Sequence, residues 1–328
     1  MSRREPTRAR KPRKPRNRKP RNRKPRNKVV DYLQYVALRS VVAAMQCWPV
    51  ESNLAFAGWL GDAMYRFDKR HRDRALDNLR RSFPDMPEAQ RAAMARRSMH
   101  MFFALFVEVL FTTRLTRLET VGQVVELSEV RQTIDLLLDE HRGVIMLTGH
   151  YGNWEILGYV LALLGFDTVS VARPLDNPYV NDWLLGVRER MGQKIVDKKG
   201  ATTDVANALE HCGAVGFIAD QNAGPKGMFV PFFGRLASTY KSIGLLAMRY
   251  RVPVVVGYAR RATGKFKFTV GTSDVIYPED WEQQDDPLRY ITERYTRAIE
   301  TFVEEDPGQY LWVHRRWKTR PKGEVAEA

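Results

Sequence analysis

Cysteine is scarce in this chain: only Cys47 and Cys212 occur among its 328 residues. They lie far apart, and neither belongs to a paired ligand motif of the C-x2-C type. This argues against a disulfide framework and a structural zinc site, and it fits a reducing, cytoplasmic setting. We predict no bound metal.

Long uncharged apolar runs are also missing. A membrane-spanning helix needs roughly 20 consecutive apolar residues, and the chain has no clear candidate. No short apolar core with a small-residue cleavage site stands near the start, which argues against a secretory signal. The sequence therefore predicts a protein on the cytoplasmic side without a clear transmembrane helix.

Signatures of an enzyme-borne nucleophile or a catalytic metal are absent as well. The chain has no G-x-S-x-G elbow and no H-E-x-x-H pattern. Chemistry through an acyl-serine or a helix-bound zinc is therefore not expected, and neither is a bound cofactor.

Positive charge is plentiful but confined to one end. The net charge is +15, and residues 1–28 hold fifteen Lys/Arg against one acid, so the rest is close to neutral. This tail repeats the unit RKPRN, which predicts a disordered, extended segment. Capture of an anionic membrane surface fits it, at about 1 kcal/mol per Lys or Arg. A solvated leader and a misassigned start stay open; nucleic acid is not the expected partner, because the tail lacks aromatic residues for base stacking.

Residues 29–115 are predicted to be helical. Pro49 divides 29–67 into two helices, and a basic helix ending at Pro84 precedes a long one through residue 111. We interpret the first two helices as lying in a membrane interface next to the basic tail. A helical layer packed on a core is the alternative.

From residue 116 onward, short β-rich runs alternate with helical patterns. The predicted strands are GVIMLTGH, TVSVAR, KIVDK, AVGFIAD, PVVVGYAR and KFKFTVG. The predicted helices cover 129–141, 154–164, 179–191, 202–211 and 239–250. This alternation predicts an α/β fold with a mixed, mostly parallel sheet flanked by helices. The predicted regions are a basic tail at 1–28, an N-terminal helical interfacial region at 29–115, an α/β core at 116–321 and a C-terminal tail at 322–328.

The stretch GVIMLTGHYGNWE places His150 at the end of a strand and Glu155 in the first turn of the next helix. Active sites of such sheets lie at strand ends, and Gly149 and Gly152 leave room for a substrate. A carboxylate on Nδ1 orients an imidazole and frees Nε2 to take a proton from a hydroxyl. The sequence favours direct acyl transfer to a substrate alcohol, with His150 as general base and Glu155 as its partner. A structural histidine beside a strand is the alternative.

Later blocks accompany this turn in a fixed order: ARPLDNPYVNDWL, then FIADQNAGPKGMFVPFFGR, then EDPGQYLWVHRRWKTRP. With RALDNLRRSFPD before them, they resemble the bacterial lipid A biosynthesis lauroyl/myristoyl acyltransferase family, from about residue 33 to residue 321. That family lies within the wider acyltransferase group marked by H-x4-D/E. The resemblance implies a peripheral or monotopic enzyme on the cytoplasmic face of the inner membrane. It would move a fatty acyl chain from an acyl carrier protein or coenzyme A thioester to a lipid A precursor, without a further cofactor.

The resemblance also implies contacts with the donor and the acceptor. Lys226 and Arg235 are expected to meet phosphate, and a helix beginning near Thr239 to offer free N–H groups. Phe229, Phe232 and Phe233 are expected to floor an acyl groove, with ordinary core packing as the alternative. The predicted substrate-binding residues are Asn153, Arg173, Asp220, Gln221, Lys226, Arg235, Thr239, His314 and Arg315.

Other functions stay open on the sequence alone. The acceptor could be a lysophospholipid, another glycolipid or an aminolipid. A hydrolase differs only in whether water or a lipid hydroxyl reaches His150. A non-enzymatic membrane or nucleic-acid binding protein is the alternative from a different class.

Overall fold

The computed structural model describes residues 27–139, 141–172, 174–189, 193–197, 201–321 and 323. Residues 1–26 of the predicted basic tail and the predicted ligand Arg173 lie outside the described residues. Of the predicted C-terminal tail, only Gly323 is described.

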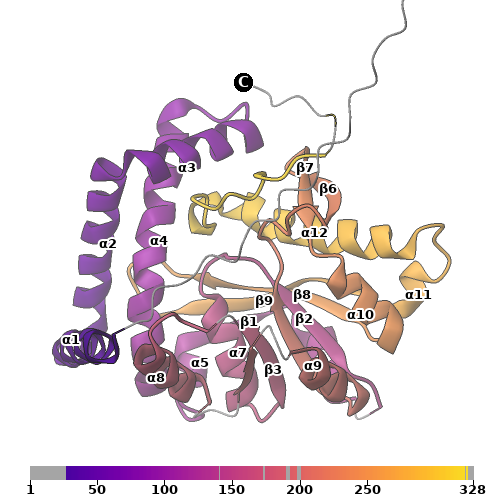
Figure 1. Ribbon diagram of the computed structural model, residues 1–328, viewed down its shortest axis with the longest axis horizontal. Coiled ribbons are helices and arrows are strands. Elements are labelled where there is room, and N and C mark those ends of the chain that lie inside the picture. The colour runs from indigo at the N-terminus through magenta and orange to yellow at the C-terminus, as the bar shows by residue number, and fades with distance from the viewer. Residues whose placement is uncertain are drawn as a thin grey trace, which may run out of the picture.

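Helices build the N-terminal part of the chain and alternate with strands after it (Figure 1). In chain order they are α1 (Lys28–Gln46), α2 (Val50–Phe67), α3 (Lys69–Ser82), α4 (Glu88–Leu115), α5 (Val121–Val124), α6 (Arg131–Leu137), α7 (Trp154–Leu163), α8 (Pro178–Glu189), α9 (Ala201–Glu210), α10 (Ser242–Tyr250), α11 (Pro278–Trp281), α12 (Pro287–Glu305) and the 3-10 helix η1 (Pro307–Gln309). The Asn27 and Asp68 side chains cap α1 and α3, and Pro49 and Pro87 precede α2 and α4. The predicted division of residues 29–67 into two helices is confirmed.

The strands form a twisted sheet and a separate hairpin. They are β1 (Val125–Ser128), β2 (Val144–Thr148), β3 (Thr168–Ala172), β4 (Gln193–Asp197), β5 (Ala214–Ile218), β6 (Met228–Phe232), β7 (Arg235–Thr239), β8 (Val254–Arg261) and β9 (Phe268–Ile276). The seven-stranded sheet has the order β1-β9-β8-β2-β5-β3-β4, and β6 pairs with β7. Of the sheet's pairs, β8 with β9 is antiparallel and the others are parallel. The predicted fold class is therefore confirmed.

Strand order decides which segments meet at the edge of the sheet. β2 runs parallel to β5, with Thr148 opposite Ile218. Because parallel neighbours end at the same edge of a sheet, the segments that follow them leave the sheet side by side. These segments carry His150 and Asp220.

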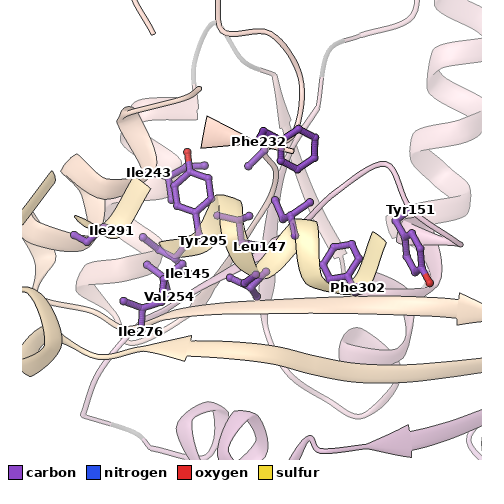
Figure 2. Close-up of a cluster of buried hydrophobic side chains, with 14 of the residues drawn as sticks. Ile145, Leu147, Tyr151, Phe232, Ile243, Val254, Ile276, Ile291, Tyr295 and Phe302 are labelled. Carbon is purple, nitrogen blue, oxygen red and sulfur yellow. The ribbon is translucent and has the colours of Figure 1, made fainter. Parts of the chain in front are cut away.

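A large apolar core lies between the sheet and α9, α10 and α12. Ile145 and Leu147 of β2 point into this core, and Figure 2 shows Tyr295 and Phe302 of α12 in the same cluster. Met146 alternates to the opposite face, which α6 and α7 cover. Full burial of one such side chain contributes about 1.5–3 kcal/mol, so the alternation fixes which way β2 faces.

Helix α4 is, among the described helices, the one long and apolar enough to cross a membrane by length and composition. Of its apolar window, 44% is buried inside the protein. Its Glu108 is fully buried and paired with Arg261 of β8 at 2.6 Å. These contacts make α4 part of the folded core.

The predicted elements and the observed ones differ in a few places. Each of the six predicted strands has a counterpart, but β1, β6, β7 and α12 are not among the predictions. β1 has four residues, and the hairpin contains Pro231 and a turn at Phe233 and Gly234, both with positive φ. Such residues favour a loop over a strand. The helix predicted to begin near Thr239 begins at Ser242.

Candidate active site

His150, after β2, is held by Asp220, after β5. Nδ1 of His150 lies 2.6 Å from Oδ1 of Asp220, and the His150 backbone N–H donates to Oδ2 at 2.9 Å. The His150 side chain is 14% exposed and that of Asp220 only 2%. A carboxylate on Nδ1 places the ring proton there and leaves a lone pair on Nε2. This is the arrangement of a general base.

Electrostatics keeps Asp220 ionised despite its burial. Burial alone raises the pKa of this carboxyl, but the charge and hydrogen bonds of His150 hold its pKa well below the usual range. Burial and the charge of Asp220 raise the pKa of the nearby Tyr310 hydroxyl, so no second negative charge forms there. His150 therefore has an ionised partner that stabilises its protonated ring.

The turn after His150 requires glycine. Gly152 has φ +56°, and a Cβ there would lie 1.9 Å from the carbonyl oxygen of Ala259 in β8. The Asn153 N–H donates to that carbonyl at 2.9 Å, and the Gly152 N–H donates to the Gln309 carbonyl at 3.0 Å. The turn is therefore fixed between β8 and the C-terminal segment, which brings the sequence blocks HYGNWE and GQYLWVHRRW into contact.

Asn153 builds this turn and does not face a substrate. Its Oδ1 accepts hydrogen bonds from the Glu155 and Ile156 backbone N–H groups at the start of α7. Its Nδ2 donates to Glu108 at 2.9 Å, and the residue is fully buried. The predicted substrate contact is therefore corrected to a helix cap, because both polar atoms of the side chain are used inside the protein.

Glu155 is not the partner of His150. Its carboxylate forms a two-bond ion pair with Arg188 of α8, at 2.9 Å from Nε and 2.5 Å from Nη2. The predicted contact is corrected for a physical reason: the Glu155 side chain leaves α7 toward α8, and Asp220 already occupies Nδ1. The importance of Glu155 for activity stays a prediction.

Trp154, Gln221 and His314 surround the His150 ring. The ring centroids of Trp154 and His314 lie 4.9 Å and 4.6 Å from that of His150, and Gln221 Nε2 lies 3.1 Å from His150 Nε2. Burial, followed by the charge of His150, lowers the pKa of His314 to about 4, so this ring is neutral near pH 7. The structure brings the predicted residues Gln221 and His314 to His150, together with Asp220, which contacts the histidine itself.

Arg316 lies buried behind the site. Its Nη1 donates to the carbonyls of Gln221 and Ser238 at 3.1 and 2.7 Å, and its Nη2 to Thr239 Oγ1 at 2.7 Å. Burial lowers the pKa of the Arg316 guanidinium. The nearby Tyr310 and Asp220 act in the opposite direction and raise that pKa. Thr239 is fully buried, so its predicted phosphate contact is corrected to support for Arg316.

The remaining predicted ligands lie farther out. Lys226 is exposed in the loop between β5 and β6, and Arg315 is exposed in the C-terminal segment. The Arg235 guanidinium lies 3.6 Å from the centroid of the Trp317 ring. Phe232 and Phe233 belong to the apolar core, so for these two the alternative of core packing is correct and the predicted acyl groove is not formed by them.

Positive charge gathers beside His314. Burial lowers the pKa of Arg74, and the neighbouring charges of Arg315 and Arg70 lower it further. Arg74 donates to the Val313 carbonyl at 3.1 Å, and none of the three forms an ion pair with a carboxylate in the described part of the chain. We call Arg70, Arg74 and Arg315 the arginine cluster.

An apolar cavity of about 180 Å³ lies beneath the site, between the sheet and α6 and α7. Trp154 lines it and also contacts the His150 ring, and the Glu155–Arg188 pair lines it too. Most of its other lining residues are apolar, for example Leu157, Leu161, Phe166, Phe217 and Val270. Within the described ranges, no group of three or more His, Cys, Asp or Glu is placed to hold a metal.

Sequence reasoning missed Arg188, Glu108 and Arg261, and it grouped Arg316 with the basic residues expected at a phosphorylated head group, whereas Arg316 is buried against Gln221, Ser238 and Thr239. Glu108 and Arg261 are fully buried and, through Asn153, fix the turn that carries His150. The one available signal is a glutamate inside the apolar run MFFALFVEVLF, since an acidic residue in a buried helix needs a basic partner. Arg188 carries no comparable local signal.

The chain is similar to known proteins over most of its length. The family model described as bacterial lipid A biosynthesis acyltransferase matches residues 18–319. A lipid A biosynthesis acyltransferase of Haemophilus influenzae is 28% identical over 80% of this chain and 82% of its own length. The lipid A biosynthesis lauroyltransferase of Escherichia coli is 27% identical over 80% of this chain and 84% of its own. The myristoyltransferase of the same pathway and organism is 25% identical over 84% of this chain and 82% of its own.

Proposed function

Since the chain belongs to the bacterial lipid A biosynthesis acyltransferase family and is thus an acyltransferase, we propose that it transfers a fatty acyl chain from an acyl thioester to a hydroxyl group of a lipid A precursor. The observation that carries this proposal is the His150–Asp220 pair, which lies at the strand ends beside an apolar cavity. The donor is an acyl carrier protein or coenzyme A thioester, and no further cofactor takes part.

The proposed chemistry is direct transfer without an acyl-enzyme. Nε2 of His150 takes the proton of the acceptor hydroxyl while the hydroxyl oxygen attacks the acyl carbon. The carbon–sulfur bond then breaks, and the imidazolium returns the proton to the leaving thiolate. Asp220 stabilises the transient positive charge on His150 and keeps the ring in one tautomer.

The apolar cavity is suited to the acyl chain. Each methylene moved from water into it contributes about 0.8 kcal/mol. Trp154 lies between the cavity and His150, so a chain in the cavity has its thioester end next to the base. The Glu155–Arg188 pair supplies the charged part of the lining.

The arginine cluster is suited to the acceptor head group. Arginine binds phosphate with two parallel hydrogen bonds. Among the described residues, neither Arg74 nor Arg315 forms an ion pair, although the charge of Asp68 acts on Arg74. His314 packs against the His150 ring and feels the charge of Arg74. An anionic head group at the arginine cluster would therefore lie near the base, where its neighbouring hydroxyl could meet His150.

Membrane association is supported by exposed apolar side chains on the N-terminal helices. Trp48, Trp59 and Phe67 are 65%, 61% and 76% exposed, and Phe56 stacks on Trp59. The interfacial patch comprises Val29, Tyr32, Leu33, Val41, Trp48, Phe56, Trp59, Phe67 and Phe106. Large apolar side chains exposed in such number on neighbouring helices are typical of an interaction surface. We place the enzyme on the cytoplasmic face of the inner membrane, held by this patch and by the basic tail.

The test is acyl transfer by the full chain in detergent micelles. Lauroyl, myristoyl and palmitoleoyl thioesters of acyl carrier protein and of coenzyme A are offered with a lipid A precursor that has a free hydroxyl. Mass spectrometry is expected to find one acyl group added to the precursor, and His150→Ala to abolish the addition. Equal release of free fatty acid with and without the precursor would make the protein a thioester hydrolase instead.

A further inference from the structure

A side-chain amide occupies the nitrogen of His150 that the proposed reaction uses. Gln221 Nε2 lies 3.1 Å from His150 Nε2. Nδ1 donates its hydrogen to the Asp220 carboxylate, so Nε2 carries the lone pair and the Gln221 amide is the donor. While the Gln221 amide occupies Nε2, His150 cannot take a proton from a hydroxyl group.

The backbone around Gln221 is held by buried contacts, whereas its side chain makes one hydrogen bond, to His150, among the described residues. Asp220 accepts two hydrogen bonds from His150, and the Gln221 carbonyl accepts one from buried Arg316. The Gln221 side chain is half-buried, and among the described residues it forms a single hydrogen bond, the one with His150. Rotation of the side chain therefore frees Nε2 without moving the loop.

We propose that Gln221 determines the choice between lipid hydroxyl and water: its amide holds Nε2 while no acceptor is bound and yields to the acceptor hydroxyl. This rests on the proposed function. The lipid acceptor is held by contacts remote from the hydroxyl, and that binding free energy can displace one hydrogen bond. Water has no such contacts, so it competes poorly with the amide for Nε2.

The reaction that Gln221 suppresses is hydrolysis of the donor. Nε2 takes a proton from water, the water oxygen bonds to the acyl carbon, and the carbon–sulfur bond breaks. The thiolate then receives the proton from the imidazolium, which gives free fatty acid and thiol. Gln221 acts through His150 and contacts neither the acyl carbon nor the attacking oxygen, so it is a positioning residue.

The test compares Gln221→Met with the unaltered full chain. Methionine keeps the length and bulk of the side chain but donates no hydrogen bond. We expect thioester hydrolysis without acceptor to rise about two- to ten-fold, which is the value of one hydrogen bond expressed as a rate ratio. Transfer with saturating lipid A precursor is expected to change less, so the ratio of transfer to hydrolysis falls.

Two further variants sharpen the result. Gln221→Glu places a carboxylate where it holds a proton on Nε2, and both rates are expected to fall. Asn222→Ala removes the neighbouring amide, which contacts Thr319 at 3.0 Å and not His150, and the ratio is expected to stay unchanged. If Gln221→Met does not fold, Gln221→Asn, whose amide is one methylene too short, takes its place.

The proposal is overturned if Gln221→Met, or its substitute, keeps the unaltered ratio or changes it only as Asn222→Ala does. Failure of the proposed function looks different. In that case the unaltered chain adds no acyl group to the lipid A precursor, whatever residue stands at position 221.

Discussion

The carboxylate of Asp220 holds both the ring and the backbone of His150: Oδ1 lies 2.6 Å from Nδ1, and Oδ2 accepts the His150 N–H at 2.9 Å. One buried acid thus fixes the position of the turn, the tautomer of the ring and the charge balance of the pair. Asp220 comes from β5 and His150 from β2, which are adjacent parallel strands. The His150–Asp220 pair is therefore built by the sheet and not by the local H-x4-E sequence.

Asp220→Asn is expected to lower acyl transfer about 10²–10⁴-fold, the range of a lost general-base contribution. The introduced asparagine amide has the same shape but carries no negative charge to stabilise the protonated His150. It also favours the tautomer with its proton on Nε2, which cannot accept a proton from the hydroxyl. The measurement is kcat with saturating thioester and lipid acceptor. Asp204→Asn, which alters a surface ion pair with Lys194, is the matched control and is expected to keep full activity. A loss of only two- or three-fold in Asp220→Asn would contradict the assignment.

Glu155 and Arg188 are expected to act as one unit. Each side chain is about one-fifth exposed and each binds the other with two hydrogen bonds. Glu155→Ala and Arg188→Ala are each expected to remove most of the transfer activity, because either change leaves an unpaired charge in the cavity lining. The double variant is expected to lose no more than the worse single variant. Fully additive losses in kcat/KM would show that the two residues act separately.

The sequence predicted the position of His150 because that prediction is local. An apolar run ending in glycine and histidine specifies a strand end whatever lies around it. The partner was mispredicted because it depends on strand order: β5 follows β3 and β4 in the chain but lies next to β2 in the sheet. Glu155 was the nearest acid in sequence, and nothing local distinguishes it from Asp220.

The same distinction applies to the other elements. The strands in the centre of the sheet were predicted, since they are short, mainly apolar runs bounded by turn residues. Helix α12 was predictable but is not among the predictions: Pro287 stands at its start, and Ile291, Tyr295 and Phe302 are buried at helical spacing. The hairpin β6–β7 was not predictable, because Pro231 in β6 is a residue that sequence rules assign to loops or edges.

His314 is expected to make the protein less stable in mild acid. Its pKa is lowered from 6.5 to about 4 by burial and by His150. Between these values the unfolded chain binds a proton at this residue and the folded protein does not. The free energy of unfolding therefore falls as the pH is lowered from about 6.5 to about 4, by on the order of 2–3 kcal/mol.

The measurement is denaturant unfolding of the full chain at several pH values across this window. His314→Gln is expected to remove most of the slope. His211, which is exposed and lies between α9 and β5, is the control. His211→Gln is expected to keep the slope. Equal slopes in all three proteins would refute the assignment to His314.

The buried pair Glu108–Arg261 is expected to support the whole site. Both side chains are at most 2% exposed, and Glu108 also accepts from Asn153 at 2.9 Å. Glu108→Gln is expected to lower the free energy of unfolding by about 3–5 kcal/mol, because it leaves Arg261 buried and uncompensated. Glu293→Gln in the exposed pair with Arg289 is the control, with an expected loss below about 1 kcal/mol. Similar losses in the two variants would contradict this account.

The interfacial patch is expected to bind membranes even when salt screens the basic tail. Phe56 and Trp59 stack on each other at the surface of α2 and are 50% and 61% exposed. Replacing both by serine removes two aromatic side chains, each worth about 1.5–3 kcal/mol on transfer from water, so partitioning is expected to weaken about 100-fold or more. The measurement is sedimentation with anionic phospholipid vesicles.

High salt shortens the range of the tail's attraction to the membrane and leaves the apolar contribution in place. The contrast between the variants is therefore expected to be largest in high salt. The matched control replaces Leu245 and Met248, exposed on α10, which lies on the opposite side of the molecule from α2 (Figure 1). This control is expected to bind vesicles as the unaltered chain does. If the Phe56 and Trp59 variant also binds normally in high salt, α2 does not enter the membrane interface.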